Sequence, residues 1–215
     1  MDLREITIGQ VLQKVGYKTG VVGKWDGGRA KRFLPLQRGF DFFYGFASTG
    51  IDYWTHERYG VPSMMRGNDD INEEGYATDL FRREAVKFIR ENKSKPFFLY
   101  VPFNAPHSAS NLRKDSYQAP KEFIDLYPEP KDNRAVNRTK YMAMVTSMDA
   151  PIGALLDTLR ELGLERDTLV IFFPTTAAAV QRIIIRCAAE KATLGKAGYA
   201  FRSSRVGPAK FPQAK

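Results

Sequence analysis

The stretch YKTGVVGKWDGG at residues 17–28 decides the fold of this chain. Residues 17–22 form a short, apolar and β-branched segment, which is typical of a buried strand, and the glycine-rich residues 23–28 predict a loop after it. A helix is predicted just before this strand, because Thr7 can cap a helix that Gly16 ends. The order helix, strand, loop indicates an α/β sheet, whose functional side chains lie beyond the carboxyl ends of its strands.

The alternation of helix and strand patterns continues as far as residue 173. The predicted elements are, in chain order, an irregular segment at 29–75, a helix at 78–92 capped by Thr78, a strand at 97–103, a polar segment at 108–133, a helix at 134–162 that Pro151 breaks or kinks, and a strand at 168–173.

Length and composition limit the class of protein. The chain has 215 residues with 43% hydrophobic and 27% charged residues, which favours one soluble globular domain. No run of 18 apolar residues occurs, so no membrane span is predicted. The N-terminus lacks a basic start followed by an apolar segment, which predicts no signal peptide and a cytoplasmic location. A single cysteine, Cys187, excludes an internal disulfide and a cysteine metal cluster.

The composition changes at Pro174. Residues 174–215 hold eight Lys or Arg and one acidic residue, so +7 of the net charge of +9 lies there and only +2 on residues 1–173. The basic character therefore belongs to this segment, which we call the basic tail, and does not indicate a nucleic-acid-binding face on the domain. The basic tail shows no recognisable element and is predicted to be poorly ordered, with only residues 183–185 and Phe201 adhering to the domain.

Two strand ends carry side chains with useful chemistry. Lys24 follows the first predicted strand and could offer a point charge with three donors to an anion, or be a solvated turn lysine. His107 follows the second strand and could donate a proton to a leaving-group oxygen, or be a surface loop histidine.

The chain resembles the sulfatase family of the alkaline-phosphatase-like superfamily over residues 5–173. The motifs that carry the resemblance are TIGQVL at 7–12, GYKTG at 16–20, GKW at 23–25, RGFD at 38–41, FYG at 43–45, DYWTH at 52–56, KPFFLY at 95–100, APH at 105–107 and the stretch 159–173. DYWTH and the YATD at 76–79 are similar to the arylsulfatase B-like branch. The resemblance implies a mixed, mostly parallel sheet with helices on both faces.

The resemblance also implies a chemistry. In the family, an oxidised Cys or Ser, formylglycine, attacks sulfur, a calcium ion polarises the sulfate, and lysines and histidines neutralise and protonate the ester. By resemblance, Lys24 and His107 contact the sulfate, His107 protonates the leaving group, and His56 lines the substrate cleft, where a structural role is the alternative. The expected partner is a sulfated small molecule or glycan.

This chain departs from the family pattern in several places. Asp26 stands where the family has a histidine, and its carboxylate would repel a sulfate. The first strand with its paired aspartates, the C/S-x-P-x-R nucleophile segment and the Asp-Asn-Gly-Gly calcium motif do not occur in the 215 residues. We therefore expect residues 1–173 to form a partial catalytic domain that retains no metal ligands, no bound calcium and no formylglycine, with little or no turnover.

The basic tail can be interpreted as an out-of-frame segment. Read two bases later, codons for residues 174–179 permit Asp-Asn-Gly-Gly, those for 183–191 permit Asn-Asn-Pro-Leu-Arg-Gly-Gly-Lys, and those for 194–202 permit Trp-Glu-Gly-Gly-Leu-Arg-Val-Pro. These are the family's next motifs in order, and one deleted base near the Phe173 codon would produce the tail.

A phosphodiester hydrolase of the same superfamily is a weaker enzyme alternative, since it would need metal ligands that are also missing from the 215 residues. Two functions of other classes stay open from the sequence. The first is a non-catalytic module that binds an anion or glycan through Lys24 and His107. The second is a basic, nucleic-acid-associated protein, which would bind through residues 174–215 and with a steep dependence on salt.

Overall fold

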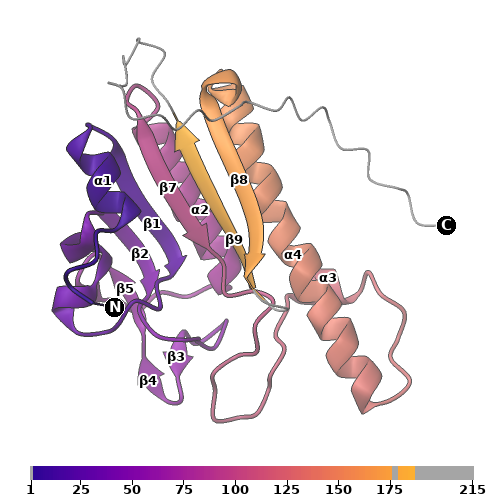
Figure 1. The fold of residues 1–215 in the computed structure, drawn as a ribbon. Helices are drawn as coiled ribbons and strands as arrows, with labels where there is room; N and C mark the ends of the chain where they lie inside the picture. Colours follow the sequence, from indigo (N-terminus) through magenta and orange to yellow (C-terminus); the bar gives the residue numbers. More distant parts are fainter. Residues whose placement is uncertain (1, 176–178, 187–215) are drawn as a thin grey trace.

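A computed structural model describes residues 2–175 and 179–186 of the chain. It contains a seven-stranded sheet in the order β6-β5-β2-β1-β7-β9-β8 (Figure 1). The strands are β1 Lys18–Lys24, β2 Phe42–Phe46, β5 Met64–Arg66, β6 Asp69–Asp70, β7 Phe97–Pro102, β8 Thr168–Thr175 and β9 Ala179–Arg186, with a separate hairpin of β3 Glu57–Arg58 and β4 Val61–Pro62. The helices are α1 Ile8–Lys14, α2 Ala77–Glu91, α3 Lys121–Ile124 and α4 Asn133–Glu161, with short 3-10 turns at Lys31–Phe33, Pro35–Arg38 and Glu165–Asp167.

The sheet is mixed, and its parallel part lies at the centre. β1 pairs in parallel with β2 on one side and β7 on the other. β5 and β6 continue the sheet beyond β2 in antiparallel order, and β9 and β8 continue it antiparallel beyond β7. The mixed α/β sheet predicted from the sequence is confirmed, although parallel pairing is confined to β1, β2 and β7.

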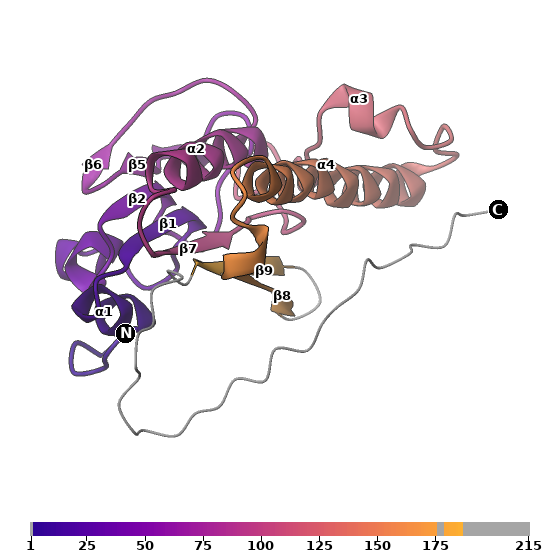
Figure 2. The same cartoon turned by 90° about the horizontal axis from the view of Figure 1, so that it is seen from above.

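Both faces of the central strands are covered, and each face has its own hydrophobic core. α2 and α4 lie over one face, whereas α1 lies on the other (Figure 2). Because neighbouring side chains of a strand point to opposite faces, Val22 and Tyr44 pack in the core beneath α2 and α4, while Val21 and Phe43 pack in the core on the α1 side. Burial on both faces explains why these strands lack a polar alternation.

The helix predictions were mostly confirmed. Thr7 caps α1, and its hydroxyl accepts from the Gln10 backbone while the Gln10 side chain accepts from Thr7 N, which makes a capping box. Two details differ. The cap of α2 is Tyr76, two residues before the predicted cap, and the helix contains Thr78 as a buried residue. α4 runs unbroken through Pro151, because the lost backbone hydrogen bond is offset by burial of its neighbours on this helix in the core.

The prediction that residues 29–75 are irregular was wrong for the segment FFYGF of β2. This strand has no alternation of polar and apolar residues, since four of its five residues are buried. The two outer strands β5 and β6 span three and two residues, which is too short for a sequence pattern.

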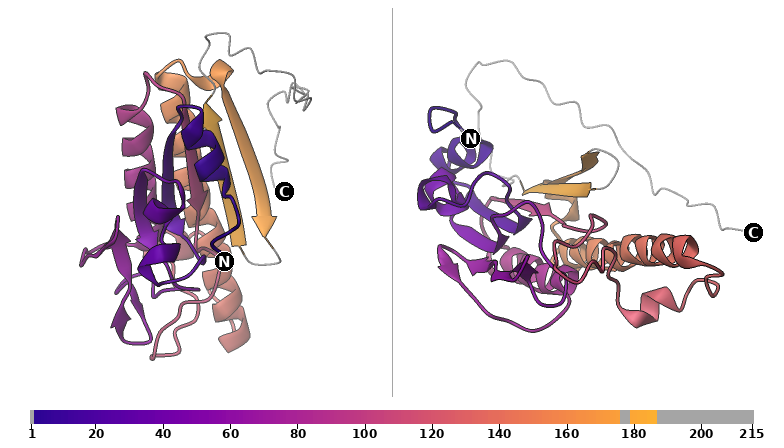
Figure 3. Two further views of the ribbon diagram at one scale, coloured as in Figure 1. Left: turned by 60° about the vertical axis from the view of Figure 1, so that its left-hand side comes forward. Right: turned by 90° about the horizontal axis from the view of Figure 1, so that it is seen from below.

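The strand β9 differs from the expectation that no regular element follows Phe173. Its backbone lies between β7 and β8 and pairs with both, and Ile183, Ile184 and Ile185 stand opposite Tyr100, Leu99 and Phe98 (Figure 3). The predicted adhesion of residues 183–185 therefore takes the form of strand pairing. The expectation for residues 187–215 falls outside the described residues. No helix in the part of the chain described here is long and apolar enough to cross a bilayer.

Candidate functional site

Lys24 and His107 lie at the same edge of the sheet. Lys24 is the last residue of β1, and His107 comes five residues after β7 ends at Pro102. β1 and β7 are parallel neighbours in the register Val21 to Tyr100, so their carboxyl ends meet. Figure 1 shows the loop after β7 and the β3–β4 hairpin at this same end of the molecule. The sequence prediction of a site at this edge is therefore consistent with the topology.

The strands approach one another closely at this edge because two glycines replace side chains. A Cβ on Gly23, whose φ is +126°, would lie 2.2 Å from the Pro102 carbonyl oxygen of β7. A Cβ on Gly45, whose φ is +151°, would lie 1.9 Å from the Gly23 carbonyl oxygen. Both backbones thus need glycine, and together they place the end of β1 firmly between β2 and β7.

Lys24 is held at this edge with one charged neighbour. Its side chain is 19% exposed, and its Nζ lies 3.6 Å from Asp26 Oδ2. Asp26 is itself exposed and takes a left-handed backbone conformation with φ of 27°, which turns it back towards the lysine. An ammonium group that is partly buried and close to a carboxylate can still receive an anion, but Asp26 competes for it.

His107 is anchored through its backbone and through one ring nitrogen. Its N–H donates to the Asn104 carbonyl at 2.8 Å, and its own carbonyl accepts from the Tyr53 hydroxyl at 2.8 Å. Nδ1 lies 2.9 Å from the Ser108 carbonyl oxygen, which can only accept, so Nδ1 carries a proton. This arrangement leaves Nε2 as the nitrogen that can meet a ligand.

His56 has a structural role in the fold. The residue is 3% exposed and has a left-handed φ of 58°. Its Nε2 bonds the Gly75 carbonyl at 2.9 Å, and burial lowers the pKa of the imidazole, so this contact holds the segment before α2. This burial and this contact favour the structural role that the sequence left as the alternative for His56.

The carboxylate of Asp52 is the centre of a network that sequence reasoning missed. Its side chain is fully buried. Oδ1 accepts from the backbone of Trp54 and Thr55, both at 2.9 Å. Oδ2 accepts from three side chains of the loop that follows His107, namely Asn111 at 2.9 Å, Gln118 at 2.8 Å and Arg113 at 3.3 Å. Burial alone would raise the pKa of this carboxyl group, but the hydrogen bonds outweigh it and lower the pKa to about 2.

This lowered pKa predicts a pH-dependent contribution to stability. Because the folded state holds the Asp52 pKa below its ordinary 3.8, the ionised group stabilises the fold by about 2 kcal/mol at neutral pH, and this is lost as pH falls from about 4 towards 2. We expect urea denaturation to show Asp52→Asn less stable than wild type at pH 7, with the difference in unfolding free energy narrowing by about 1.5 kcal/mol at pH 2.5. Asp125→Asn, an exposed control paired with Lys121, should leave only a small gap at both pH values. A gap for Asp52→Asn that does not change with pH would contradict the assignment.

The described residues do not fit the calcium site that the family resemblance implies. Across residues 2–175 and 179–186, no group of three or more His, Cys, Asp or Glu side chains is placed to hold a metal ion. A calcium ion takes six to eight oxygen ligands, so isolated carboxylates at the edge would not suffice.

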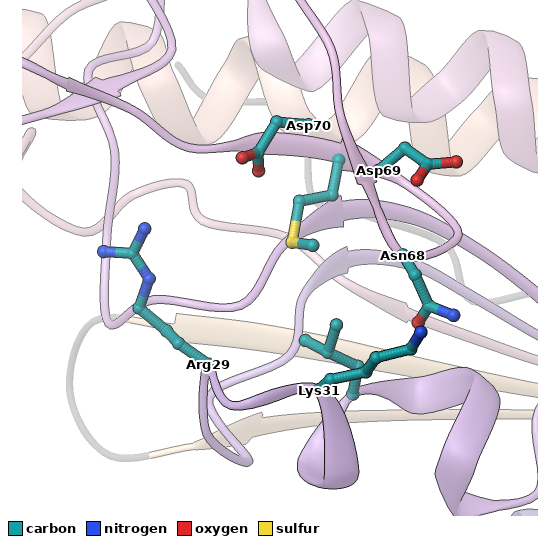
Figure 4. A pocket seen from close by; sticks show the side chains of 7 residues that line it. Arg29, Lys31, Asn68, Asp69 and Asp70 are labelled. Carbon is teal, nitrogen blue, oxygen red and sulfur yellow. The ribbon is translucent and has the colours of Figure 1, made fainter.

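A pocket of about 310 Å³ is lined by seven other residues (Figure 4). Leu34 and Met65 contribute its apolar lining. Its polar lining comes from both signs of charge and one amide: Arg29, Lys31, Asp69, Asp70 and Asn68. Neither Lys24 nor His107 lines it, and its mixed charge does not favour an anion over a cation.

Comparisons with known proteins agree with the fold and the motifs. The sulfatase family model matches residues 2–174. Arylsulfatase J of Mus musculus is 30% identical over 182 residues, which cover 80% of this chain and 29% of that protein. N-acetylgalactosamine-6-sulfatase of Rattus norvegicus is 28% identical, covering 80% of this chain and 32% of that protein. The chain thus spans about a third of the length of these relatives.

Solved structures are similar as well. Ps i-CgsB, whose crystal structure is in complex with k-i-k-neocarrahexaose, has a TM-score of 0.68 and 26% identity, covering 86% of this chain and 48% of that one. The PsFucS1 sulfatase from Pseudoalteromonas sp. has a TM-score of 0.58 and 25% identity, covering 85% of this chain and 45% of that one. A family match over residues 2–174, on a mixed α/β sheet with the family's lysine and histidine motifs at one edge, shows that this chain belongs to the sulfatase family.

Proposed function

We propose that this chain binds sulfate esters at the carboxyl edge of β1 and β7, with Lys24 and His107 as the contacting residues. The observation that carries the proposal is that Lys24 ends β1 and that His107 lies in the loop after the adjacent parallel strand β7, with Nδ1 of His107 already engaged by Ser108. A lysine ammonium supplies charge to the sulfate, and the remaining imidazole nitrogen can donate to an ester oxygen when protonated.

We infer a sulfated carbohydrate or aryl sulfate as the ligand class. Support comes from the names of the relatives, which include an arylsulfatase and an N-acetylgalactosamine-6-sulfatase. The structure of Ps i-CgsB with a bound oligosaccharide also supports a carbohydrate as the ligand.

We further propose that this chain by itself does not hydrolyse the ester. The 215 residues contain no C/S-x-P-x-R segment to supply the nucleophile, and Cys187 lies in Arg-Cys-Ala-Ala. The out-of-frame interpretation of residues 174–215 is part of this proposal, and sequencing the gene around the Phe173 codon tests it. If one additional base there restores the family motifs after residue 173, the interpretation is supported. If the gene repeats the present frame without those motifs, the interpretation is refuted.

Calorimetry with 4-nitrophenyl sulfate tests the binding site. We expect weak binding that Lys24→Ala abolishes and that Asp26→Asn strengthens, because the amide removes the carboxylate competing for the ammonium group at 3.6 Å. Lys31→Ala is the matched control, since this lysine lines the separate pocket. Loss of binding in Lys31→Ala with retention in Lys24→Ala would move the anion site to that pocket and refute the proposal.

A further inference from the structure

The loop that follows His107 is tied to the turn at residues 52–56 by three side-chain donors. Asn111, Arg113 and Gln118 all reach Asp52 Oδ2 across about sixty residues of chain. The same carboxylate closes its own turn through the amides of Trp54 and Thr55. One buried charge therefore joins two segments that share no strand or helix. Removing this charge should lower the stability of the domain.

Gln118 extends this connection to Tyr53. Its Oε1 accepts from the Tyr53 backbone N–H at 2.8 Å, while its Nε2 donates to Asp52 Oδ2 at 2.8 Å. Its carbonyl accepts from the Tyr76 hydroxyl at 2.9 Å, and the Tyr53 and Tyr76 rings stack with centroids 5.6 Å apart. Tyr53 is fully buried, so its hydroxyl is directed by packing as well as by hydrogen bonds.

The far end of this chain of contacts is His107. The Tyr53 hydroxyl donates to the His107 carbonyl, and the Ser108 carbonyl that accepts from Nδ1 belongs to the first residue of the tied loop. A shift of either segment would change the backbone of His107 or the partner of its ring. The orientation of Nε2 thus depends on both ends of the Asp52 network.

We propose that Asp52 is a positioning residue for His107, and that its carboxylate, acting through Gln118 and Tyr53, fixes the ring tautomer and the direction of Nε2. This inference rests on the proposed function in one respect only, namely that the positioned His107 ring contacts a sulfate ester. The positioning itself is a property of the protein without any ligand, and can be measured separately.

Nitrogen-15 NMR of the histidine rings tests the proposal, because the chain has two histidines and both belong to the described part. In the wild type at pH 9 we expect His107 to show one tautomer, with the proton on Nδ1. Asp52→Asn should give a mixture of tautomers at His107. An amide has an NH2 group in place of one carboxylate oxygen, and this group cannot accept the hydrogen bonds that Asp52 accepts. A wild-type tautomer in folded Asp52→Asn would overturn the proposal.

Glu84→Gln is the matched control. Glu84 is also a buried carboxylate, 3% exposed, but it accepts from Arg66 of β5 and Arg83 of α2 and not from the loop after His107. It should lower stability without changing the His107 tautomer. If both variants changed the tautomer alike, the effect would be general loosening and the positioning role would be refuted. Should Asp52→Asn fail to fold, two milder variants remain: Tyr53→Phe, which removes the hydroxyl that donates to His107, and Gln118→Ala, which removes the bonds of this side chain to Tyr53 and Asp52. Both are expected to show the same tautomer mixture, and unchanged tautomers in both would overturn the proposal.

Added sulfate separates this inference from the proposed function. If His107 of the wild type does not respond to sulfate, the proposed function fails while the tautomer comparison still stands. If it responds, Asp52→Asn should weaken sulfate binding about tenfold, since a misdirected ring loses a positioned contact, and Glu84→Gln should not. Equal sulfate affinity in wild type and Asp52→Asn would refute the proposal that the orientation of the His107 ring contributes to sulfate binding.

Discussion

Gly45→Ala is expected to abolish the fold of the domain or to destabilise it by on the order of 4 kcal/mol or more. The new Cβ would stand 1.9 Å from the Gly23 carbonyl oxygen, which is backbone of the neighbouring strand and cannot rotate away. The φ of +151° at this position adds strain for any residue with a side chain. Since β1 carries Lys24 at its end, relief of the clash would also displace the candidate site.

Circular dichroism and urea denaturation measure this effect. The matched control is Gly153→Ala in α4, where a Cβ would meet nothing within 4 Å. Because alanine favours a helix over glycine, the control should be as stable as wild type or more stable by up to about 1 kcal/mol. Equal stability of Gly45→Ala and Gly153→Ala would show that the close approach of β1 and β2 is wrong.

Hydrolysis of 4-nitrophenyl sulfate by the purified chain is expected to be absent. Removing a catalytic nucleophile costs about six orders of magnitude in a well-studied protease, and Lys24 and His107 alone would supply binding and a proton without an attacking atom. The assay is the release of nitrophenolate over several hours, with and without added calcium. His107→Ala serves as the control, because any trace of activity from a contaminating sulfatase would persist in it. Hydrolysis that His107→Ala eliminates would refute the proposed lack of turnover.

The parts of the fold that the sequence predicted are those with local signals. Thr7 and Gln10 form a capping box within four residues, and the end of β1 is marked by apolar residues followed by glycine, so α1 and β1 could be identified. β2 could not, because its five residues FFYGF include a glycine and no β-branched residue, whereas β1 has the β-branched residues Thr19, Val21 and Val22. β9 was missed for another reason, since its pairing depends on β7 and β8 on either side of it.

The candidate site likewise contains residues that the sequence predicted and residues whose role it did not predict. Lys24 and His107 were predicted because they lie at or shortly after the carboxyl end of a strand, and such a position is visible in the sequence. The role of Asp52 was not visible, since its donors come from residues about sixty positions away. His56 was assigned to the cleft by resemblance, and only the fold shows that Gly75 takes its Nε2.

The substitution at position 26 shows how one side chain can change a site. A carboxylate 3.6 Å from the Lys24 ammonium group partly satisfies the charge that a sulfate would otherwise meet. Asp26 is more than half exposed, so the energy of the pair is small, and the lysine stays available to an anionic ligand.

The most direct test of the sulfate site is an NMR titration of the two histidine rings with sodium sulfate, with sodium chloride at matched ionic strength as the reference. The account predicts that the ring resonances of His107 shift in a saturable manner, that those of the buried His56 do not, and that Lys24→Ala removes the response. A His107 ring that does not respond to sulfate, or that responds equally in Lys24→Ala, would contradict the account.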